Sequence, residues 1–275
     1  MKGSILITGC SSGIGRYCAE QLHQSGYQVI ASCRKSEDVE ELKAQGLNCV
    51  QLDVTDPESI HNALNETLKI TGGTLDALFN NAAYGQTGAI EDLPTDALRA
   101  QFETNVFGWH ELTKAVIPLM LKQGKGKIIQ NSSVLGLVAM KYRGAYNSSK
   151  FALEGYTDTL RLELMDTDIS VSLIEPGPIV SKFRENALRM FNLNIDMEHS
   201  RHKSSYQNTI ERLGKKSPSN RFTLPPEAVL KPLIHILEND RPKPRYYVTQ
   251  PTYLFGFLRR ILPVKTLDRI LVKSD

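Results

Sequence analysis

The architecture of this chain can be argued from Ser4-Ile5-Leu6-Ile7-Thr8-Gly9-Cys10-Ser11-Ser12-Gly13-Ile14-Gly15. The first four residues are an apolar run of strand length, and the residues after Gly15 suit a helix. The glycines between them permit a tight turn, which brings backbone N–H groups and a helix N-terminus close to a phosphate group. Strand, glycine-rich turn and helix in this order therefore predict the first unit of a nucleotide-binding sheet. The spacing is Gly-x-x-x-Gly-x-Gly, which differs from the commoner Gly-x-Gly-x-x-Gly fingerprint.

The rest of the chain repeats this alternation of strand and helix. Strands are predicted near 3–8, 27–33, 47–52, 75–80, 126–132, 169–175 and 244–248. Stretches that favour helices occupy 13–25, 37–45, 57–70, 95–121, 145–167, 226–239 and 253–262. This pattern predicts an α/β fold, a doubly wound Rossmann-type parallel sheet with helices on both faces. Ligands of such sheets bind at the carboxyl ends of the strands, where the strand order reverses.

A second pattern lies on the predicted helix 145–167. Tyr146 and Lys150 are four residues apart and project from one helix face, thirteen residues after Ser133. A free phenol has a pKa near ~10, and we expect the neighbouring ammonium group to lower it into the range useful for acid–base chemistry. Taken alone the spacing is weak, and a chance pairing on one helix face is an equal alternative.

The ordered set of motifs closely resembles the short-chain dehydrogenase/reductase family over residues 3–180. The matching motifs are the cofactor turn Thr8–Gly15, the adenine-side Asp53-Val54, the Asn-Asn-Ala-Gly-like Asn80-Asn81-Ala82-Ala83 and the nicotinamide-side Pro176-Gly177. The resemblance also implies a catalytic tetrad of Asn105, Ser133, Tyr146 and Lys150. Ala83 stands where the family usually has glycine. We expect this difference to affect the local backbone geometry more than the activity. Thr8–Gly13 and Ile174–Ile179 further resemble bacterial NADP-dependent aldehyde reductases and steroid- or retinol-type members.

The resemblance implies a nicotinamide cofactor, and the end of the second predicted strand indicates which one. Val29–Lys35 holds no acidic residue for a ribose 2′-hydroxyl, whereas Arg34, with Lys35 beside it, can pair with a 2′-phosphate. We therefore expect NADP(H), with a simple solvated arginine as the alternative. The predicted cofactor-binding residues are Gly9, Ser11, Ser12, Gly13, Ile14, Gly15, Arg34, Asp53, Val54, Asn81, Ala82, Tyr146, Lys150, Pro176, Gly177 and Ile179. Asp53 has a second interpretation, as a cap for the turn before the predicted helix 57–70.

The resemblance implies hydride transfer from NADPH to a carbonyl carbon, with Ser133 holding the carbonyl oxygen and Tyr146 supplying the proton. Lys150 would hold the nicotinamide ribose, and Asn105 would hold a water molecule that relays protons to Lys150. Ser132 is the alternative to Ser133, and an asparagine that bonds local backbone at a helix irregularity is the alternative for Asn105. We expect a reductase of aldehydes or ketones with apolar tails, because Val134–Met140 is uncharged. A hydroxysteroid or retinol-like alcohol dehydrogenase and a non-catalytic NADPH-sensing protein are the alternatives, and no metal site is expected.

We expect one domain over 1–275, with the cofactor-binding and catalytic core at 1–180. Residues 181–224 lie where the family places its substrate lid, and a helix pair that fills its own core is an equal alternative there. Residues 225–249 supply the last helix and strand, and 250–275 a basic amphipathic extension. From 241 to 275 there are eight Lys/Arg and two Asp, a net charge of +6 in a chain of net charge +3. The extension at 253–273 fits a peripheral membrane helix, although packing on the pocket or on a partner subunit is favoured.

Composition agrees with a single enzyme domain. A chain of 275 residues with 41% hydrophobic content can bury a full core, and a net charge of +3 gives no reason to expect nucleic-acid binding. No stretch reaches transmembrane length, and no signal peptide is expected. All four cysteines lie in the first fifty residues without metal-type spacing, which indicates reduced thiols and a cytoplasmic location. The resemblance implies a homodimer or homotetramer formed through 95–121 and 145–167.

Overall fold

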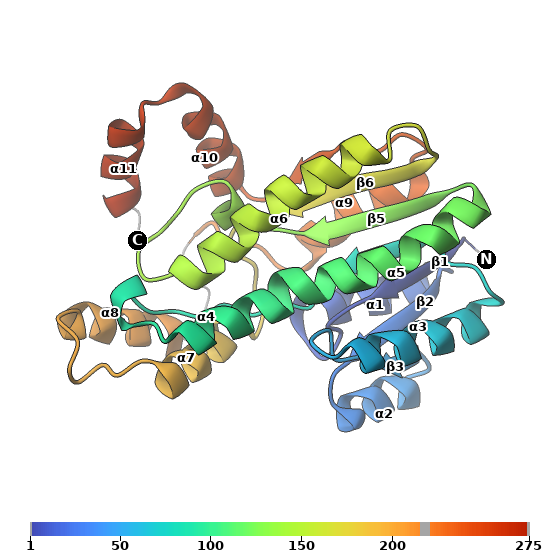
Figure 1. Cartoon of the computed structure of the whole chain (residues 1–275), viewed down its shortest axis with the longest axis horizontal. Coiled ribbons are helices and arrows are strands. Elements are labelled where there is room, and N and C mark those ends of the chain that lie inside the picture. The colour runs from blue at the N-terminus through green and yellow to red at the C-terminus, as the bar shows by residue number, and fades with distance from the viewer. Residues whose placement is uncertain (1, 215–220, 274–275) are drawn as a thin grey trace.

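The computed structural model describes residues 2–214 and 221–273, and a seven-stranded sheet forms the centre of that part of the chain. The strands are β1 (Ser4–Ile7), β2 (Gln28–Cys33), β3 (Asn48–Gln51), β4 (Ala77–Asn80), β5 (Gly126–Asn131), β6 (Ile169–Glu175) and β7 (Arg245–Tyr247). Their spatial order is β3-β2-β1-β4-β5-β6-β7, and every neighbouring pair is parallel (Figure 1). The strand order reverses between β1 and β4, so the predicted doubly wound parallel sheet is confirmed.

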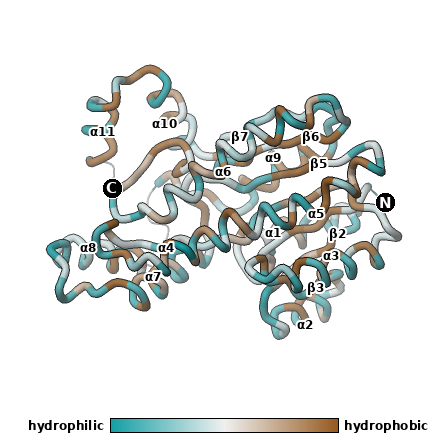
Figure 2. Tube along the Cα trace, viewed as in Figure 1, coloured by the Kyte–Doolittle hydropathy of each residue, from teal (hydrophilic) through white to brown (hydrophobic). Residues whose placement is uncertain are grey.

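Helices cover both faces of the sheet because successive strand residues point to opposite sides. Ile5 and Ile7 of β1 belong to one apolar core, which is completed by α1 (Gly13–Gln24), α2 (Ser36–Ala44) and α9 (Glu227–Glu238). Leu6, between them, belongs to the core beneath α3 (Pro57–Thr71), α5 (Gly108–Gln123) and α6 (Gly144–Glu163). All four β1 residues are buried, as expected for a strand covered on both faces. The hydrophobic colouring of the central strands in Figure 2 follows this arrangement.

The single helix predicted over 95–121 is wrong. The chain forms α4 (Thr95–Phe102), then a π-helical segment, η2 (Glu103–Phe107), and only then α5. Asn105 lies in the wider turn, where its buried side chain is held by backbone and hydroxyl groups outside the helix. Helical periodicity in the sequence does not register such contacts, and π segments of this kind often mark functional positions.

The segment predicted to be a substrate lid forms two helices, α7 (Phe183–Asn194) and α8 (Lys203–Gly214). Phe191, Ile195 and Tyr206 form a small core of their own together with Ala89. The segment returns to the body at Leu224, whose carbonyl accepts a hydrogen bond from the Val180 N–H at 2.9 Å. Residues 215–220 of the predicted lid lie outside the described residues.

The C-terminal part forms a helical hairpin of α10 (Gln250–Ile261) and α11 (Val264–Lys273). The sequence predicted the first of these helices, with a later start, and did not predict the second. Pro251 stands in the first turn of α10, where its missing N–H costs no helix hydrogen bond. Within the described residues, no helix has both the length and the apolar character to cross a membrane.

Candidate active site

A cavity of about 1950 Å³ lies at the carboxyl edge of the sheet and extends under the lid. Its walls include residues that directly follow β1, β2, β4, β5 and β6, which is where ligands of doubly wound sheets bind. It exceeds the roughly 300–1,000 Å³ of an ordinary small-molecule pocket. All the predicted site residues line it except Gly15 and Asn105.

The glycine-rich turn is held against the end of β4. Thr8 Oγ1 accepts hydrogen bonds from the backbone N–H groups of Asn81 and Ala82 at 2.8 and 2.9 Å, and the Asn81 side chain donates back to the Thr8 carbonyl. Gly9 has a φ of +73°, and a Cβ there would lie 2.8 Å from Ala82 Cα. A Cβ on Gly15 would lie 2.4 Å from the Gly9 carbonyl oxygen, so Gly15 permits α1 to approach the turn and does not itself line the cavity.

One end of the cavity is suited to an anion. Gly13 and Ile14, the first residues of α1, line it, and helix N-terminal N–H groups together with the helix dipole favour a phosphate. Further along the cavity, Arg34 and Lys35 form part of the wall. Asp38, which the sequence analysis missed because it lies beyond the strand end, brings a carboxylate to the same lining.

Asp53 both lines the cavity and holds a local turn. Its Oδ1 accepts hydrogen bonds from the Thr55 N–H at 2.9 Å and the Thr55 hydroxyl at 2.8 Å. The N-cap of α3 is Asp56, whose side chain accepts from the Glu58 N–H. The turn-holding interpretation of Asp53 therefore describes its observed contacts.

Tyr146, Ser133 and Lys150 come together at the other end of the cavity. Tyr146 forms a hydrogen bond with Ser133, whose Oγ also accepts the Leu135 N–H at 3.1 Å. Ser132 points elsewhere and donates to Glu154, so Ser133 is the serine that meets the tyrosine. Lys150 Nζ lies 5.7 Å from the centre of the Tyr146 ring.

The expected lowering of the tyrosine pKa by Lys150 is wrong for this structure. Burial raises the pKa of Tyr146 to about 12, against a smaller lowering effect of the hydrogen bond with Ser133. Burial lowers the pKa of Lys150 to about 7, while the negative charge of Glu154 acts in the opposite direction. The desolvation that accompanies burial disfavours both charged forms, and sequence spacing contains no information about its size.

Asn131 and Trp109 hold the side chain of Lys150, and Asn105 connects Tyr84 with the neighbouring Ser149. The Lys150 ammonium donates to the Asn131 carbonyl at 2.7 Å and lies 4.5 Å from the centre of the Trp109 ring. Asn105 donates to the Tyr84 carbonyl at 3.0 Å and to Ser149 Oγ at 3.2 Å, and its Oδ1 accepts the Tyr84 N–H. The interpretation of Asn105 as a residue that bonds backbone at a helix irregularity thus matches its side-chain contacts.

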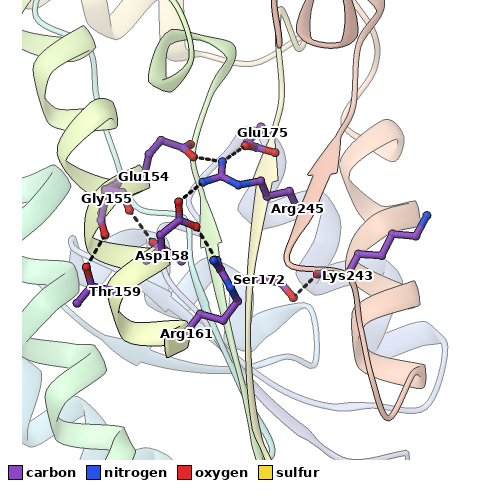
Figure 3. A network of polar contacts seen from close by, with 11 residues as sticks. Glu154, Gly155, Asp158, Thr159, Arg161, Ser172, Glu175, Lys243 and Arg245 are labelled. Atoms are coloured by element: carbon purple, nitrogen blue, oxygen red, sulfur yellow. Dashed lines mark hydrogen bonds and ion pairs between the residues drawn. The ribbon is translucent and has the colours of Figure 1, made fainter. Parts of the chain in front are cut away.

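A partly buried charged network lies behind Tyr146 and Lys150 (Figure 3). Glu154 of α6 and Glu175 of β6 both accept hydrogen bonds from Arg245 of β7, and Asp158 accepts a third at 2.7 Å. Burial and the charge of Glu154 raise the pKa of Glu175 to about 8, although Arg245 opposes the shift. The network connects the last strand to the helix that carries Tyr146 and to the strand that precedes Pro176.

The segment predicted to be a lid forms one wall of the cavity. Phe183 packs edge-on against Tyr146 with ring centres 5.2 Å apart, and Leu135, Met190 and Phe255 add apolar surface. Charged lid residues that the sequence analysis did not single out also line the cavity: Lys182, Arg184, Glu185, Arg189 and Arg212. The described part of 181–224 therefore has its own small core, as one interpretation expected, and it also forms a wall of the cavity, while its role as a substrate lid stays a prediction.

Comparison with known proteins agrees with this geometry. The family model described as short chain dehydrogenase matches residues 4–191. The chain belongs to the short-chain dehydrogenase family. It is 40% identical to the uncharacterized oxidoreductase YbbO of Escherichia coli (strain K12) over 271 residues, which cover 98% of this chain and 94% of that relative.

Two further proteins are similar over nearly the whole chain. The NADPH-dependent 3-dehydrocapnine reductase of Ornithobacterium rhinotracheale is 33% identical, covering 98% of this chain and 96% of the relative. The crystal structure of a short-chain dehydrogenase from Streptomyces avermitilis superposes with a TM-score of 0.77 at 26% identity, covering 98% of this chain and 93% of that one. This protein is therefore an oxidoreductase of the short-chain dehydrogenase family.

The site fits the nicotinamide cofactors that short-chain dehydrogenases use. The glycine turn brings backbone to the cavity wall where a Cβ on Gly9 would clash with Ala82 and one on Gly13 with Ser181, and cations line the same cavity. Ala83, the departure from the family motif, has no positive φ, so glycine is not required there. Asn131 and Trp109 were missed by the sequence analysis, although Trp109 is the single tryptophan of the chain and lies four residues after Asn105.

Proposed function

We propose that this short-chain dehydrogenase is an NADPH-dependent reductase of aldehyde or ketone carbonyls, with Tyr146 as the proton donor. The observation that carries the proposal is the meeting of Tyr146, Ser133 and Lys150 in the same cavity as the glycine turn and Arg34. The similarity to a relative named as an NADPH-dependent reductase supports the choice of cofactor and direction.

Ser133, Tyr146 and Lys150 would each have a separate role in the reduction. The bound nicotinamide would supply the hydride. The Ser133 hydroxyl would hold the carbonyl oxygen, and Tyr146 would donate its phenolic proton to that oxygen. A tyrosine whose pKa is about 12 is protonated at neutral pH, which suits proton donation and therefore reduction. The Lys150 ammonium, held by the Asn131 carbonyl and the Trp109 ring, would then stabilise the phenolate that remains.

The preference for NADP(H) rests on charge. Arg34 and Lys35 face the cavity together with a single nearby carboxylate of the same segment, Asp38. An arginine can bind a 2′-phosphate with two parallel hydrogen bonds, and two cations outweigh one carboxylate. We place the enzyme in the cytoplasm, where NADPH is available, and its four buried, unpaired cysteines support that choice.

The substrate we propose is a carbonyl compound with an apolar tail. Leu135, Met140, Leu254 and Phe255 supply apolar wall near the catalytic end of the cavity. The charged lid residues would then contact the cofactor or a polar group at the far end of the substrate.

The test is NADPH and NADH oxidation with a panel of aldehydes and ketones, comparing wild type with Tyr146→Phe. We expect turnover with NADPH, and a fall in kcat/KM of roughly 10²–10⁴-fold in the variant with NADPH affinity retained. Tyr156→Phe is the matched control, because this tyrosine of the same helix contacts His110 and does not line the cavity.

Each other outcome has a defined meaning. NADPH binding without turnover of any carbonyl would favour the sensing protein over the enzyme. Faster oxidation of alcohols with NADP⁺ than reduction of the matching carbonyls would favour the alcohol dehydrogenase. A preference for NADH would show that Arg34 does not select the cofactor.

A further inference from the structure

The outer face of α10 carries an apolar stripe, defined here as Tyr253, Leu254, Phe257 and Ile261. Three of these residues are spaced by four and so lie on one helix face. The four side chains are exposed by 59, 53, 59 and 56%, in that order. The opposite face of α10 is buried through Thr252, Phe255 and Gly256. The α10 stripe is thus an exposed apolar surface on a helix whose inner face is already packed. Within the stripe, the Tyr253 ring packs edge-on against the Tyr247 ring, with ring centres 5.4 Å apart.

The second helix of the hairpin does not cover the stripe. Leu267, Ile270 and Leu271 of α11 pack toward the core cluster that contains Val134 and Phe255. Arg259 holds the hairpin to the body, since it donates to the Leu137 carbonyl and lies over the Phe151 ring at 4.7 Å. The apolar residues that do face outward continue beyond α10 to Val264, which is 74% exposed.

Positive charge surrounds this surface. Arg260, Lys265, Arg269 and Lys273 are all exposed, and the hairpin's described residues contain a single carboxylate, Asp268. None of the four cations forms an ion pair with a carboxylate of residues 2–214 or 221–273. Exposed apolar side chains flanked by unpaired cations are the composition of helices that lie on anionic lipid surfaces.

The stripe is continuous with the wall of the cavity. Gln250, Pro251, Leu254 and Phe255 line the cavity, and Leu254 is also part of the stripe. Leu254 therefore joins the exposed stripe to the apolar wall of the cavity.

We propose that the α10 stripe and its flanking cations dock on the surface of a bilayer containing anionic lipids. Charge complementarity selects a bilayer over a second copy of this chain. A two-fold contact through this face would place Arg260 and Lys265 of one copy near the same cations of the other. An anionic lipid surface neutralises them while the apolar side chains enter the boundary between headgroups and acyl chains.

The test is co-sedimentation of the full chain with vesicles of phosphatidylcholine, alone or with about 30 mol% phosphatidylglycerol. We expect binding to the anionic vesicles that weakens as salt is raised, and binding at least roughly tenfold weaker to the neutral ones. The double variant Phe257→Asp, Ile261→Asp should lose at least tenfold in binding to the anionic vesicles. The double variant Arg260→Gln, Lys265→Gln should lose the preference for anionic lipid.

Controls separate docking from folding and from catalysis. Ile90→Asp changes an apolar residue that is 78% exposed and lies outside the hairpin, so it should bind vesicles like the wild type. Turnover of a water-soluble carbonyl should be unchanged in the hairpin variants, because Phe257, Arg260, Ile261 and Lys265 do not line the cavity. Docking does not depend on the proposed reductase activity, so failure of either can be recognised while the other stands.

Two results would overturn the proposal. The wild type would fail to sediment with any vesicle, or both hairpin variants would bind as tightly as the wild type. A wild-type dimer that the Asp variants convert to monomer, in the absence of vesicle binding, would assign the stripe to a second copy instead.

Discussion

Tyr146, Lys150 and Glu154 are spaced by four along α6, and Glu154 connects the helix face that carries Tyr146 and Lys150 to the network around Arg245. The Lys150 ammonium exists below its pKa, which burial lowers to about 7 and the Glu154 charge raises. Glu154→Gln removes that charge, so the pKa of Lys150 should fall further. The alkaline decline of kcat/KM should then begin at lower pH, by roughly one unit. Reductase assays between pH 5 and 9 measure this shift.

Asp158→Asn is the matched control for Glu154→Gln. Asp158 binds the same Arg245, but it does not contribute to the pKa shift of Lys150. We expect its pH profile to coincide with that of the wild type. If Glu154→Gln changes the melting temperature and leaves the pH profile in place, Glu154 has a structural role alone.

The C-terminus of α9 is held by Lys127, a residue of the sheet strand β5. Lys127 of β5 donates to the carbonyls of Ile236, Leu237 and Asn239 at 2.8, 2.7 and 2.8 Å, at the C-terminus of α9. These carbonyls have no intrahelical donor, and a cation is favoured at the negative end of the helix dipole. Lys127→Met keeps the apolar stem but removes the donors, and should lower Tm by roughly 4–10 °C.

Thermal unfolding measures that loss, with Lys125→Met as its control. Lys125 is two residues away and pairs with Asp76, but its side chain is 71% exposed. An exposed ion pair contributes about 0–1 kcal/mol, so we expect a change in Tm of a few degrees at most. Equal effects of the two substitutions would show that the carbonyl contacts of Lys127 do not stabilise α9.

For the whole molecule, we propose assembly through the outer surfaces of α5 and α6. Exposed apolar residues occur at the ends of both helices: Phe107, Leu121, Leu162 and Met165. We expect light scattering to give at least twice the chain mass of 30.7 kDa. Leu162→Arg would bury an unpaired charge in the interface, so it should shift the protein to the monomer.

Ile90→Arg is the control for the assembly, because Ile90 is an exposed apolar residue on η1 (Ile90–Asp92), outside both helices. It should leave the mass unchanged. A monomeric wild type, or an oligomer that Leu162→Arg does not disturb, would exclude this surface.

Much of the fold could be predicted from local sequence. Each of the seven strands lies within a predicted range, and the glycine turn stands directly after β1. For the central strands the reason is that burial on both faces requires continuous apolar residues. The break of 95–121 at η2 could not be predicted in the same way. It accompanies contacts of Asn105 with Tyr84 and Ser149, which lie 21 and 44 residues away along the chain.

The sequence alone determined the order of the elements, the family resemblance and the spacing of Tyr146 and Lys150, because these depend on neighbouring residues and helical or strand periodicity. Tertiary structure decided which charged groups of the site pair with one another and in which direction their pKa values shift. Arg245 reaches Glu154 and Glu175 from 91 and 70 residues away, and Asn131 accepts from Lys150 across 19 residues. The direction of the Tyr146 pKa shift was likewise set by burial. Desolvation and long-range pairing exist only after distant segments have packed together, so no local pattern contains them.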